Sequence, residues 1–261
     1  MNILEKIVAD KRKEVALKRS LIPTLQLEKS VLFERKCPSL ASALKTSNTG
    51  IIAEHKRRSP SKDTINQNTN IAQVAKGYQN AGVCGMSVLT DIKYFGGSLE
   101  DLLLARASVD MPLLRKEFMI DEYQVLEAKA NGADVILLIA AILSKEELKV
   151  LSELAKSLGM NVLLEIHNQQ ELNKSLLPSV DMLGVNNRNL KTFEVSLETS
   201  KSLAKEIPED FVKVSESGIS SISAIKELKE FGYQGFLIGE NFMKTENPGE
   251  SAAEFIQKLE G

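Results

Sequence analysis

The sequence contains no tryptophan, only two cysteines and only two histidines among its 261 residues. Cys37 and Cys84 provide neither a disulfide framework nor the ligand spacing of a zinc site, and we expect both to be reduced thiols in a cytoplasmic protein. No run approaches the ~20 apolar residues of a membrane span, and residues 1–15 lack the apolar stretch of a signal peptide. We therefore expect neither a disulfide-stabilised secreted scaffold nor a membrane protein.

An excess of either charge is also missing. Lys and Arg number 33, Asp and Glu number 35, and the formal net charge is −2. No global basic field favours nucleic acid, so we expect no nucleic-acid partner. Apolar residues make up 43% and charged residues 26% of the chain, which is typical of a globular protein.

What the chain does contain is a series of eight short apolar runs. They begin near residues 51, 85, 112, 134, 161, 181, 211 and 235. Segments with helical spacing lie between them, and Asn70, Ser98 and Ser144 are expected to cap three of these helices. Strict alternation of strand and helix predicts a mostly parallel sheet with right-handed crossovers. Eight such units predict an α/β fold of the (β/α)₈ TIM barrel type.

An open, doubly wound sheet is the alternative fold. Such a sheet often binds a nucleotide through a glycine-rich first turn, but the first turn here, residues 56–63, reads KRRSPSKD and has no glycine. The barrel is therefore favoured. Residues 1–48, with helical spacing over 1–20 and 38–46, are expected to form an N-terminal helical extension that packs on the barrel within a single domain, 1–261.

Most of the apolar runs end in a charged or amide residue. Alternate side chains of a barrel strand face the interior. Glu54 and Lys56, at the end of the first run, should therefore both point inward near the C-terminal mouth, with His55 directed toward the helices. A solvated strand end with a surface ion pair is the alternative for Glu54 and Lys56.

The third and fifth runs end in Lys116 and Glu165. A lysine in a partly dry cavity is expected to have a lowered pKa and to serve as a proton donor. Phe118 shares the face of Lys116 and could form an apolar wall for a planar substrate. The alternatives are a snorkelling lysine for Lys116 and a surface acid, rather than a general base, for Glu165. His167, two residues beyond Glu165, is a weaker candidate.

The sixth run continues into the polar sequence GVNNRNL at 184–190. Asn186 and Arg188 share a face if the strand continues. The arginine suits a planar carboxylate, which it can bind through two parallel hydrogen bonds. The asparagine amide donates or accepts without changing its charge. An ordinary polar loop would contain the same residues, so the position directly after a buried strand is what favours a site.

The last two runs end in SESGIS (215–220) and LIGENF (237–242). Small residues let backbone N–H groups approach a ligand, and the loops after strands seven and eight often hold phosphate in such barrels. The phosphate candidates are Ser217, Gly218, Gly239 and the backbone of Glu240, assisted by Ser59 and Ser61 in the first loop.

Seven stretches together resemble one family. They are EHKRRSPSK (54–62), SVLTDIKYFGGS (87–98), LLRKEF (113–118), LLEIH (163–167), GVNNRNL (184–190), SESGI (215–219) and LIGE (237–240). These stretches, and the N-terminal helical extension, resemble indole-3-glycerol-phosphate synthase of tryptophan biosynthesis. The chain departs from that family at His55, Asp63 and Glu117, where an aromatic residue, a glycine and an aspartate are usual.

The resemblance implies a carboxy-lyase whose small-molecule partner is an anionic sugar phosphate, 1-(2-carboxyphenylamino)-1-deoxyribulose 5-phosphate. Ring closure, loss of carbon dioxide and loss of water give indole-3-glycerol phosphate. No metal and no organic cofactor is implied, in agreement with the absence of a His/Cys metal motif. The resemblance leaves association with other tryptophan-pathway enzymes open.

The resemblance also implies roles for the strand-end residues. Lys116 would be the general acid of ring closure, Glu165 would act in dehydration, and Lys56 would orient the substrate carboxylate, although the two lysines could exchange roles. Glu54 and Asn186 would hold the lysines and the substrate hydroxyl. Arg188 and Glu216 would anchor the reactive end of the substrate.

Two other functions remain open from the residues. One is another phosphate-binding barrel, such as the isomerase that acts one step earlier on phosphoribosylanthranilate. That reaction requires Cys or Asp as acid and base, whereas the strand ends here supply Lys and Glu. The other is a non-catalytic barrel that binds a sugar phosphate or serves as a scaffold.

Overall fold

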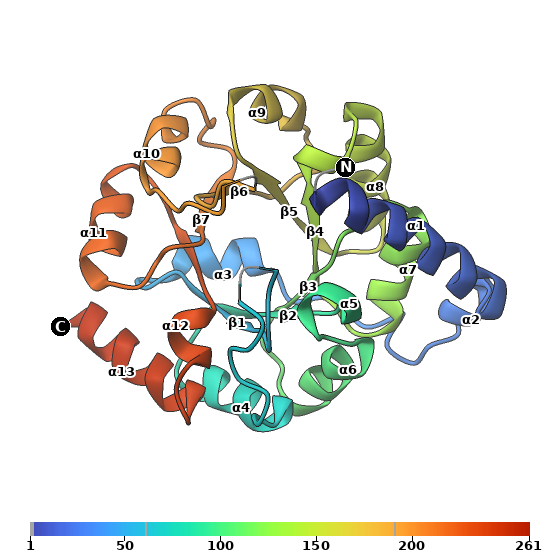
Figure 1. The fold of residues 1–261 in the computed structure, drawn as a ribbon, viewed down its shortest axis with the longest axis horizontal. Helices are drawn as coiled ribbons and strands as arrows, with labels where there is room; N and C mark the ends of the chain where they lie inside the picture. The colour runs from blue at the N-terminus through green and yellow to red at the C-terminus, as the bar shows by residue number, and fades with distance from the viewer. Residues whose placement is uncertain (1–2, 61, 191) are drawn as a thin grey trace.

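The computed structural model, which describes residues 3–60, 62–190 and 192–261, is a closed parallel barrel seen along its axis in Figure 1. Each strand pairs with the next in sequence, and β8 returns to pair with β1. The predicted TIM barrel is confirmed. The strands are β1 (Ile51–His55), β2 (Gly85–Leu89), β3 (Leu113–Lys116), β4 (Val135–Ile139), β5 (Asn161–Ile166), β6 (Met182–Asn186), β7 (Val212–Glu216) and β8 (Gly235–Ile238).

Helices surround the strands, and side-chain caps fix where several of them begin. Asn70 accepts hydrogen bonds from the first turn of its helix, Ser98 caps the next long helix, and Ser144 forms a full capping box with Glu147, as predicted. The helices after β1 are α4 (Ile71–Asn80), α5 (Ile92–Phe95), α6 (Leu99–Ser108), α7 (Glu122–Ala130), the 3₁₀ turn η1 (Ala140–Ile142), α8 (Lys145–Ser157), α9 (Gln169–Ser175), α10 (Glu198–Ala204), α11 (Ile222–Glu230), α12 (Glu240–Met243) and α13 (Pro248–Glu260).

Three helices precede the barrel: α1 (Ile3–Leu21), α2 (Thr24–Leu27) and α3 (Leu40–Thr46). Helix α3 closes the N-terminal end of the barrel, where Leu40 and Leu44 are buried among inward-facing strand residues. Figure 1 shows α1 crossing the rim near β4 and α7, and the two helices α1 and α7 are in contact. The N-terminal segment therefore covers one end of the barrel and part of its other rim.

The strands separate two apolar layers. Ile52, Leu114 and Leu163 belong to a core inside the barrel, whereas Ile51 and Leu113 pack outward against the helices. Because Ile52 faces inward, the alternation of β1 also directs the next even-numbered side chains to the interior. The apolar filling stops short of the C-terminal strand ends, where charged side chains replace it.

Membrane insertion was not expected from the sequence. Among the helices that the structure describes, none combines the length and apolar character that a membrane span requires.

Candidate active site

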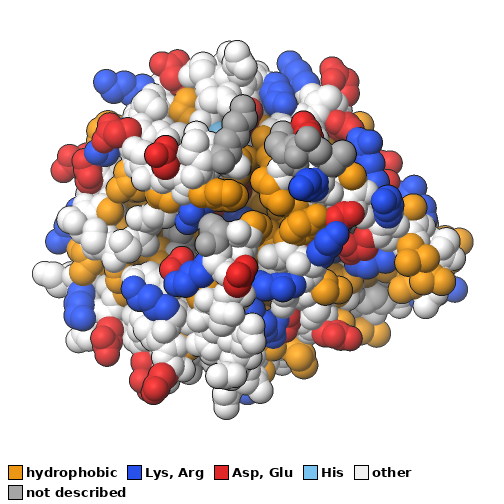
Figure 2. Space-filling model, in the orientation of Figure 1, with side chains coloured by type: hydrophobic (Ala, Val, Ile, Leu, Met, Phe, Trp, Pro, Cys, Tyr) orange, Lys and Arg blue, Asp and Glu red, His pale blue; other side chains and the backbone are white. Residues whose placement is uncertain are grey.

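A pocket of about 370 Å³ opens at the C-terminal mouth of the barrel. Figure 2 shows hydrophobic side chains gathered around the hollow on this face, with lysine, arginine and acidic side chains nearby. Ser61 lies outside the described residues. The other thirteen residues predicted for the site all line this one pocket: Glu54, Lys56, Ser59, Lys116, Phe118, Glu165, Asn186, Arg188, Glu216, Ser217, Gly218, Gly239 and Glu240.

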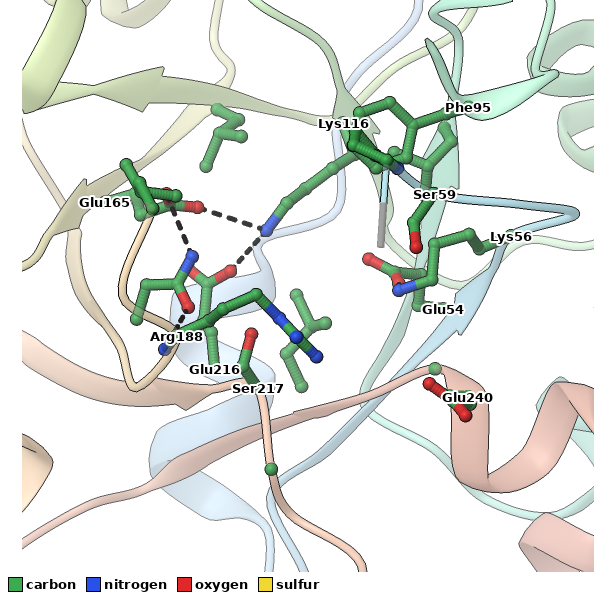
Figure 3. A pocket seen from close by; sticks show the side chains of 18 of the residues that line it. Glu54, Lys56, Ser59, Phe95, Lys116, Glu165, Arg188, Glu216, Ser217 and Glu240 are labelled. Atoms are coloured by element: carbon green, nitrogen blue, oxygen red, sulfur yellow. Dashed lines mark hydrogen bonds and ion pairs between the residues drawn. The ribbon is translucent and has the colours of Figure 1, made fainter. Parts of the chain in front are cut away.

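The Lys116 side chain extends from β3 to the centre of the pocket. Its ammonium pairs with Glu216 from β7 and lies 3.6 Å from Glu165 Oε2 on β5 (Figure 3). Burial lowers the pKa of Lys116, but the carboxylates of Glu216, Glu165 and Glu54 outweigh burial and hold it above its ordinary value. The expectation of a lowered pKa is therefore wrong, because sequence alone does not show that three carboxylates meet one ammonium.

The pKa of Glu216 is also shifted, in this case by burial. Burial raises the pKa of Glu216 to about 7; the Lys116 ammonium opposes this shift, whereas the Glu165 and Glu54 carboxylates add to it. Its Oε1 atom is buried and has no hydrogen-bond partner among the described residues. A side chain at Gly184 on the neighbouring strand would overlap this oxygen, so the glycine provides the space that Glu216 occupies.

Glu54 and Lys56 form a second ion pair across the pocket from Glu165 (Figure 3). Lys56 Nζ lies 2.6 Å from Glu54 Oε1, and the Glu54 side chain is buried. Burial raises the pKa of Glu54, but Lys56 and Lys116 outweigh it and the pKa stays below the ordinary value. A Cβ atom at Gly239 would lie 2.5 Å from Glu54 Oε1, so Gly239 also makes room for a buried carboxylate.

Glu165 is held by two neighbours. Asn186 Nδ2 donates to Glu165 Oε1 at 3.1 Å. His167 Nε2 lies 3.4 Å from the same oxygen, and its Nδ1 lies 3.1 Å from Glu171 Oε2 on α9. Burial lowers the pKa of His167, but its hydrogen bond to Glu171 and the charge of Glu165 leave that pKa raised. His167 thus contacts Glu165 but is not among the residues that line the pocket.

Arg188 lies at the rim, two residues beyond Asn186. Its backbone N–H donates to Asn186 Oδ1 at 3.0 Å, and its Nη1 donates to the carbonyl of Phe193 at 3.1 Å. In Figure 3 the Arg188 side chain runs past Glu216, and its guanidinium points into the pocket beside Ser217. This arrangement leaves a cation at the open side of the pocket.

The turn after β7 and the start of α12 form the remaining side of the pocket. Ser217 and Gly218 both have left-handed backbones, with φ of 66° and 77°, a conformation that is uncommon for serine. Glu240 begins α12, and its carboxylate accepts from Lys62 Nζ at 2.7 Å. This pair joins the loop after β1 to the loop after β8.

An apolar wall faces these polar groups, and the strand pattern of the sequence predicts only Phe118 as part of it. Ile3, Leu4 and Ile7 of α1 and Phe95 of α5 also line the pocket. The rings of Phe95 and Phe118 lie 6.0 Å apart between centroids. The sequence signal for Phe95 was its place in the stretch 87–98, whereas nothing in the spacing of α1 indicated which part of the barrel that helix covers.

The carboxylates of the pocket are engaged by ammonium and amide groups rather than arranged as metal ligands. Within the described ranges, no group of three or more His, Cys, Asp and Glu side chains has the arrangement of a metal site. The Lys, Glu, Asn and Arg side chains that line this pocket can support proton transfer and ion pairing.

Comparison with known proteins assigns the family. Residues 4–255 match the family model described as indole-3-glycerol phosphate synthase. The chain belongs to the indole-3-glycerol phosphate synthase family. It is 48% identical over 259 residues to the indole-3-glycerol phosphate synthase of Bacteroides thetaiotaomicron, with 99% of each chain covered, and 43% identical to that of a Polaromonas species, with 98% of each covered.

Family membership confirms the resemblance to a lyase of tryptophan biosynthesis that the seven sequence stretches indicated. It also decides against the alternative isomerase function. The solved structures show the barrel fold alone. A 3-hexulose-6-phosphate synthase from Salmonella typhimurium has a TM-score of 0.64 at 12% identity, covering 80% of this chain and 98% of that one. A thiamine phosphate pyrophosphorylase from Pyrococcus furiosus has a TM-score of 0.61 at 14% identity, covering 85% and 100%.

Proposed function

We propose that this pocket closes the indole ring of 1-(2-carboxyphenylamino)-1-deoxyribulose 5-phosphate and releases indole-3-glycerol phosphate. The observation that carries the proposal is the Lys116 ammonium, held at the centre of the pocket between Glu216 and Glu165. A charged donor fixed in this way can meet the ketone oxygen of the substrate at the moment the oxygen becomes a hydroxyl.

The lining of the pocket supports one orientation of the substrate. The aromatic ring packs on the apolar wall that includes Phe95 and Phe118. Lys56 binds the ring carboxylate, and Arg188 assists at the reactive end. The phosphate lies at the turn of Ser217 and Gly218 and at the start of α12, with Gly239, the Glu240 backbone and Ser59 beside it.

Ring closure forms a bond between the ring carbon that bears the carboxylate and the ketone carbon. The ketone oxygen takes a proton from Lys116 and becomes a hydroxyl group. The carboxylate then leaves as carbon dioxide, and its bonding electrons restore the aromatic ring. Glu216 contacts Lys116 and, because its pKa is about 7, can return a proton to the lysine at neutral pH.

Dehydration completes the indole. The electron pair of the nitrogen, acting through the aromatic ring, expels the hydroxyl, which leaves as water with a proton from the reprotonated Lys116. Glu165 then takes the proton from the neighbouring CH₂ carbon, and its loss forms the new double bond. Asn186 fixes Glu165 through its 3.1 Å hydrogen bond, and Glu54 holds Lys56 through the 2.6 Å ion pair. The alternative within this proposal exchanges the roles of Lys116 and Lys56.

The test is the fluorescence of indole-3-glycerol phosphate formed by the wild-type chain and by lysine variants. Lys116→Ala is expected to lower kcat by at least about 10²-fold while the circular dichroism of the fold is kept, because a positioned acid contributes about that much. Lys56→Ala should mainly raise KM. Lys149→Ala, at an exposed position of α8, is the matched control. Near-normal kcat in Lys116→Ala would remove Lys116 from the acid role, and a larger loss of kcat in Lys56→Ala would exchange the two lysines.

A further inference from the structure

Lys11 is a buried cation that the proposed reaction does not use. It lies on α1, its side chain is 2% exposed, and its ammonium contacts three carboxylates: Glu14 Oε2 at 2.7 Å, Asp91 Oδ2 at 3.0 Å and Glu117 Oε1 at 3.0 Å. Removing a charge from water is costly unless its partners are placed well. Asp91 and Glu117 come from two different strand ends, so Lys11 joins α1 to both of them.

The first partner, Asp91, fixes the short helix α5. Its Oδ1 atom accepts from the backbone N–H of Tyr94 at 2.6 Å, which caps the helix, while its Oδ2 atom faces Lys11. Helix α5 carries Phe95 into the pocket. The position of that ring therefore depends on the carboxylate that Lys11 holds.

The second partner, Glu117, fixes the segment that follows Lys116. Its Oε1 atom lies 3.0 Å from Lys11 Nζ and accepts from the backbone N–H of Phe118 at 2.9 Å. Its Oε2 atom accepts from Thr90 Oγ1 at 2.9 Å. Glu117 thus holds Phe118 in the same way that Asp91 holds α5.

One ammonium therefore sits between the supports of both aromatic rings of the apolar wall. We propose that Lys11 is a positioning residue that sets the separation of Phe95 and Phe118 and thereby the fit of the substrate's aromatic ring. This inference rests on the proposed function, which supplies a ligand with such a ring. Lys11 is not among the residues that line the pocket, so it acts only through Asp91 and Glu117.

The experiment measures the binding contribution of the ring by comparing two ligands. Indole-3-glycerol phosphate carries both ring and phosphate, whereas glycerol 3-phosphate carries only the phosphate end. The Kd of glycerol 3-phosphate divided by the Kd of indole-3-glycerol phosphate, both measured on one protein, reports the ring contribution. Calorimetry is carried out on the wild-type chain, on Lys11→Met, on Lys11→Arg and on Lys13→Met, an exposed position of the same helix.

We expect Lys11→Met to reduce that ratio about tenfold, or about 1.4 kcal/mol, with the Kd of glycerol 3-phosphate unchanged. Lys11→Arg should restore most of the ratio, and Lys13→Met should match the wild type. A purely structural role would weaken both ligands together by lowering the folded fraction. An unchanged ratio, or equal weakening of both ligands, overturns the proposal.

A second variant covers the case in which Lys11→Met does not fold because it leaves carboxylates buried without a cation. The triple variant Lys11→Met, Asp91→Asn, Glu117→Gln removes all three charges and keeps side chains that can accept the Tyr94 and Phe118 hydrogen bonds. It should show the same tenfold loss, and a wild-type ratio would overturn the proposal. Turnover by the wild-type chain is measured in parallel, since absent synthase activity refutes the proposed function while leaving the Kd comparison intact.

Discussion

Replacing Glu216 by glutamine should change how stability depends on pH. An ordinary glutamate titrates at 4.5, whereas burial raises the pKa of Glu216 to about 7. Between these two values the folded protein holds a proton that the unfolded chain has released. The free energy of unfolding therefore falls as pH rises from 4.5 to 7. At about 1.4 kcal/mol for each pH unit, this interval corresponds to a loss of about 3 kcal/mol from this one group.

Glu216→Gln removes the titration but keeps a side chain that can accept from Lys116. Urea unfolding at pH 5, 6, 7 and 8 measures the difference in unfolding free energy between variant and wild type. We expect the variant to gain on the wild type by roughly 1 kcal/mol per pH unit from pH 5 to 7 and then to level off. Glu230→Gln, at an exposed position of α11, is the control. A difference that stays constant from pH 5 to 8 would refute the reasoning.

Two further substitutions test the pocket. Glu165→Gln is expected to let the ring-closed, decarboxylated but still hydroxylated intermediate accumulate, which rapid quenching and chromatography would detect; unchanged formation of product would dismiss Glu165 from the dehydration step. Gly239→Ala places a methyl group 2.5 Å from Glu54 Oε1, so the carboxylate must move and with it Lys56. We expect kcat/KM to fall at least about tenfold with little change in the urea midpoint, because small displacements in a site are costly; full activity would show that the pair tolerates the shift.

The strands and the direction of their side chains could be predicted from the sequence because both depend on local pattern. Apolar runs of four to six residues define buried parallel strands, and each begins within one residue of its predicted position. Alternation along β1 then places Glu54 and Lys56 on the inner face once Ile52 is inside. The thirteen predicted residues share one pocket because parallel strands bring their C-terminal ends to one side of the barrel.

The remaining features depend on distances between segments that are remote in sequence. The four-residue helices α5 and α12 are too short to show a helical period. Helical spacing over residues 1–20 predicts α1, but only packing shows that Ile3 and Ile7 line the mouth. The pKa of Lys116 was predicted in the wrong direction because its neighbours come from three other strands, and their separation sets the sign of the shift.

The charge balance of the pocket explains how it can favour an anionic substrate although carboxylates dominate its centre. At the centre, the three carboxylates of Glu54, Glu165 and Glu216 outnumber the two ammonium groups of Lys56 and Lys116 when all of them are ionised. Because burial raises the pKa of Glu216 to about 7, this carboxyl group can hold a proton near neutral pH. A bound carboxylate or phosphate adds negative charge nearby and raises that pKa further. We therefore expect binding of the anion to favour a protonated Glu216, which would reduce the repulsion and place a proton beside Lys116 for the proposed ring closure.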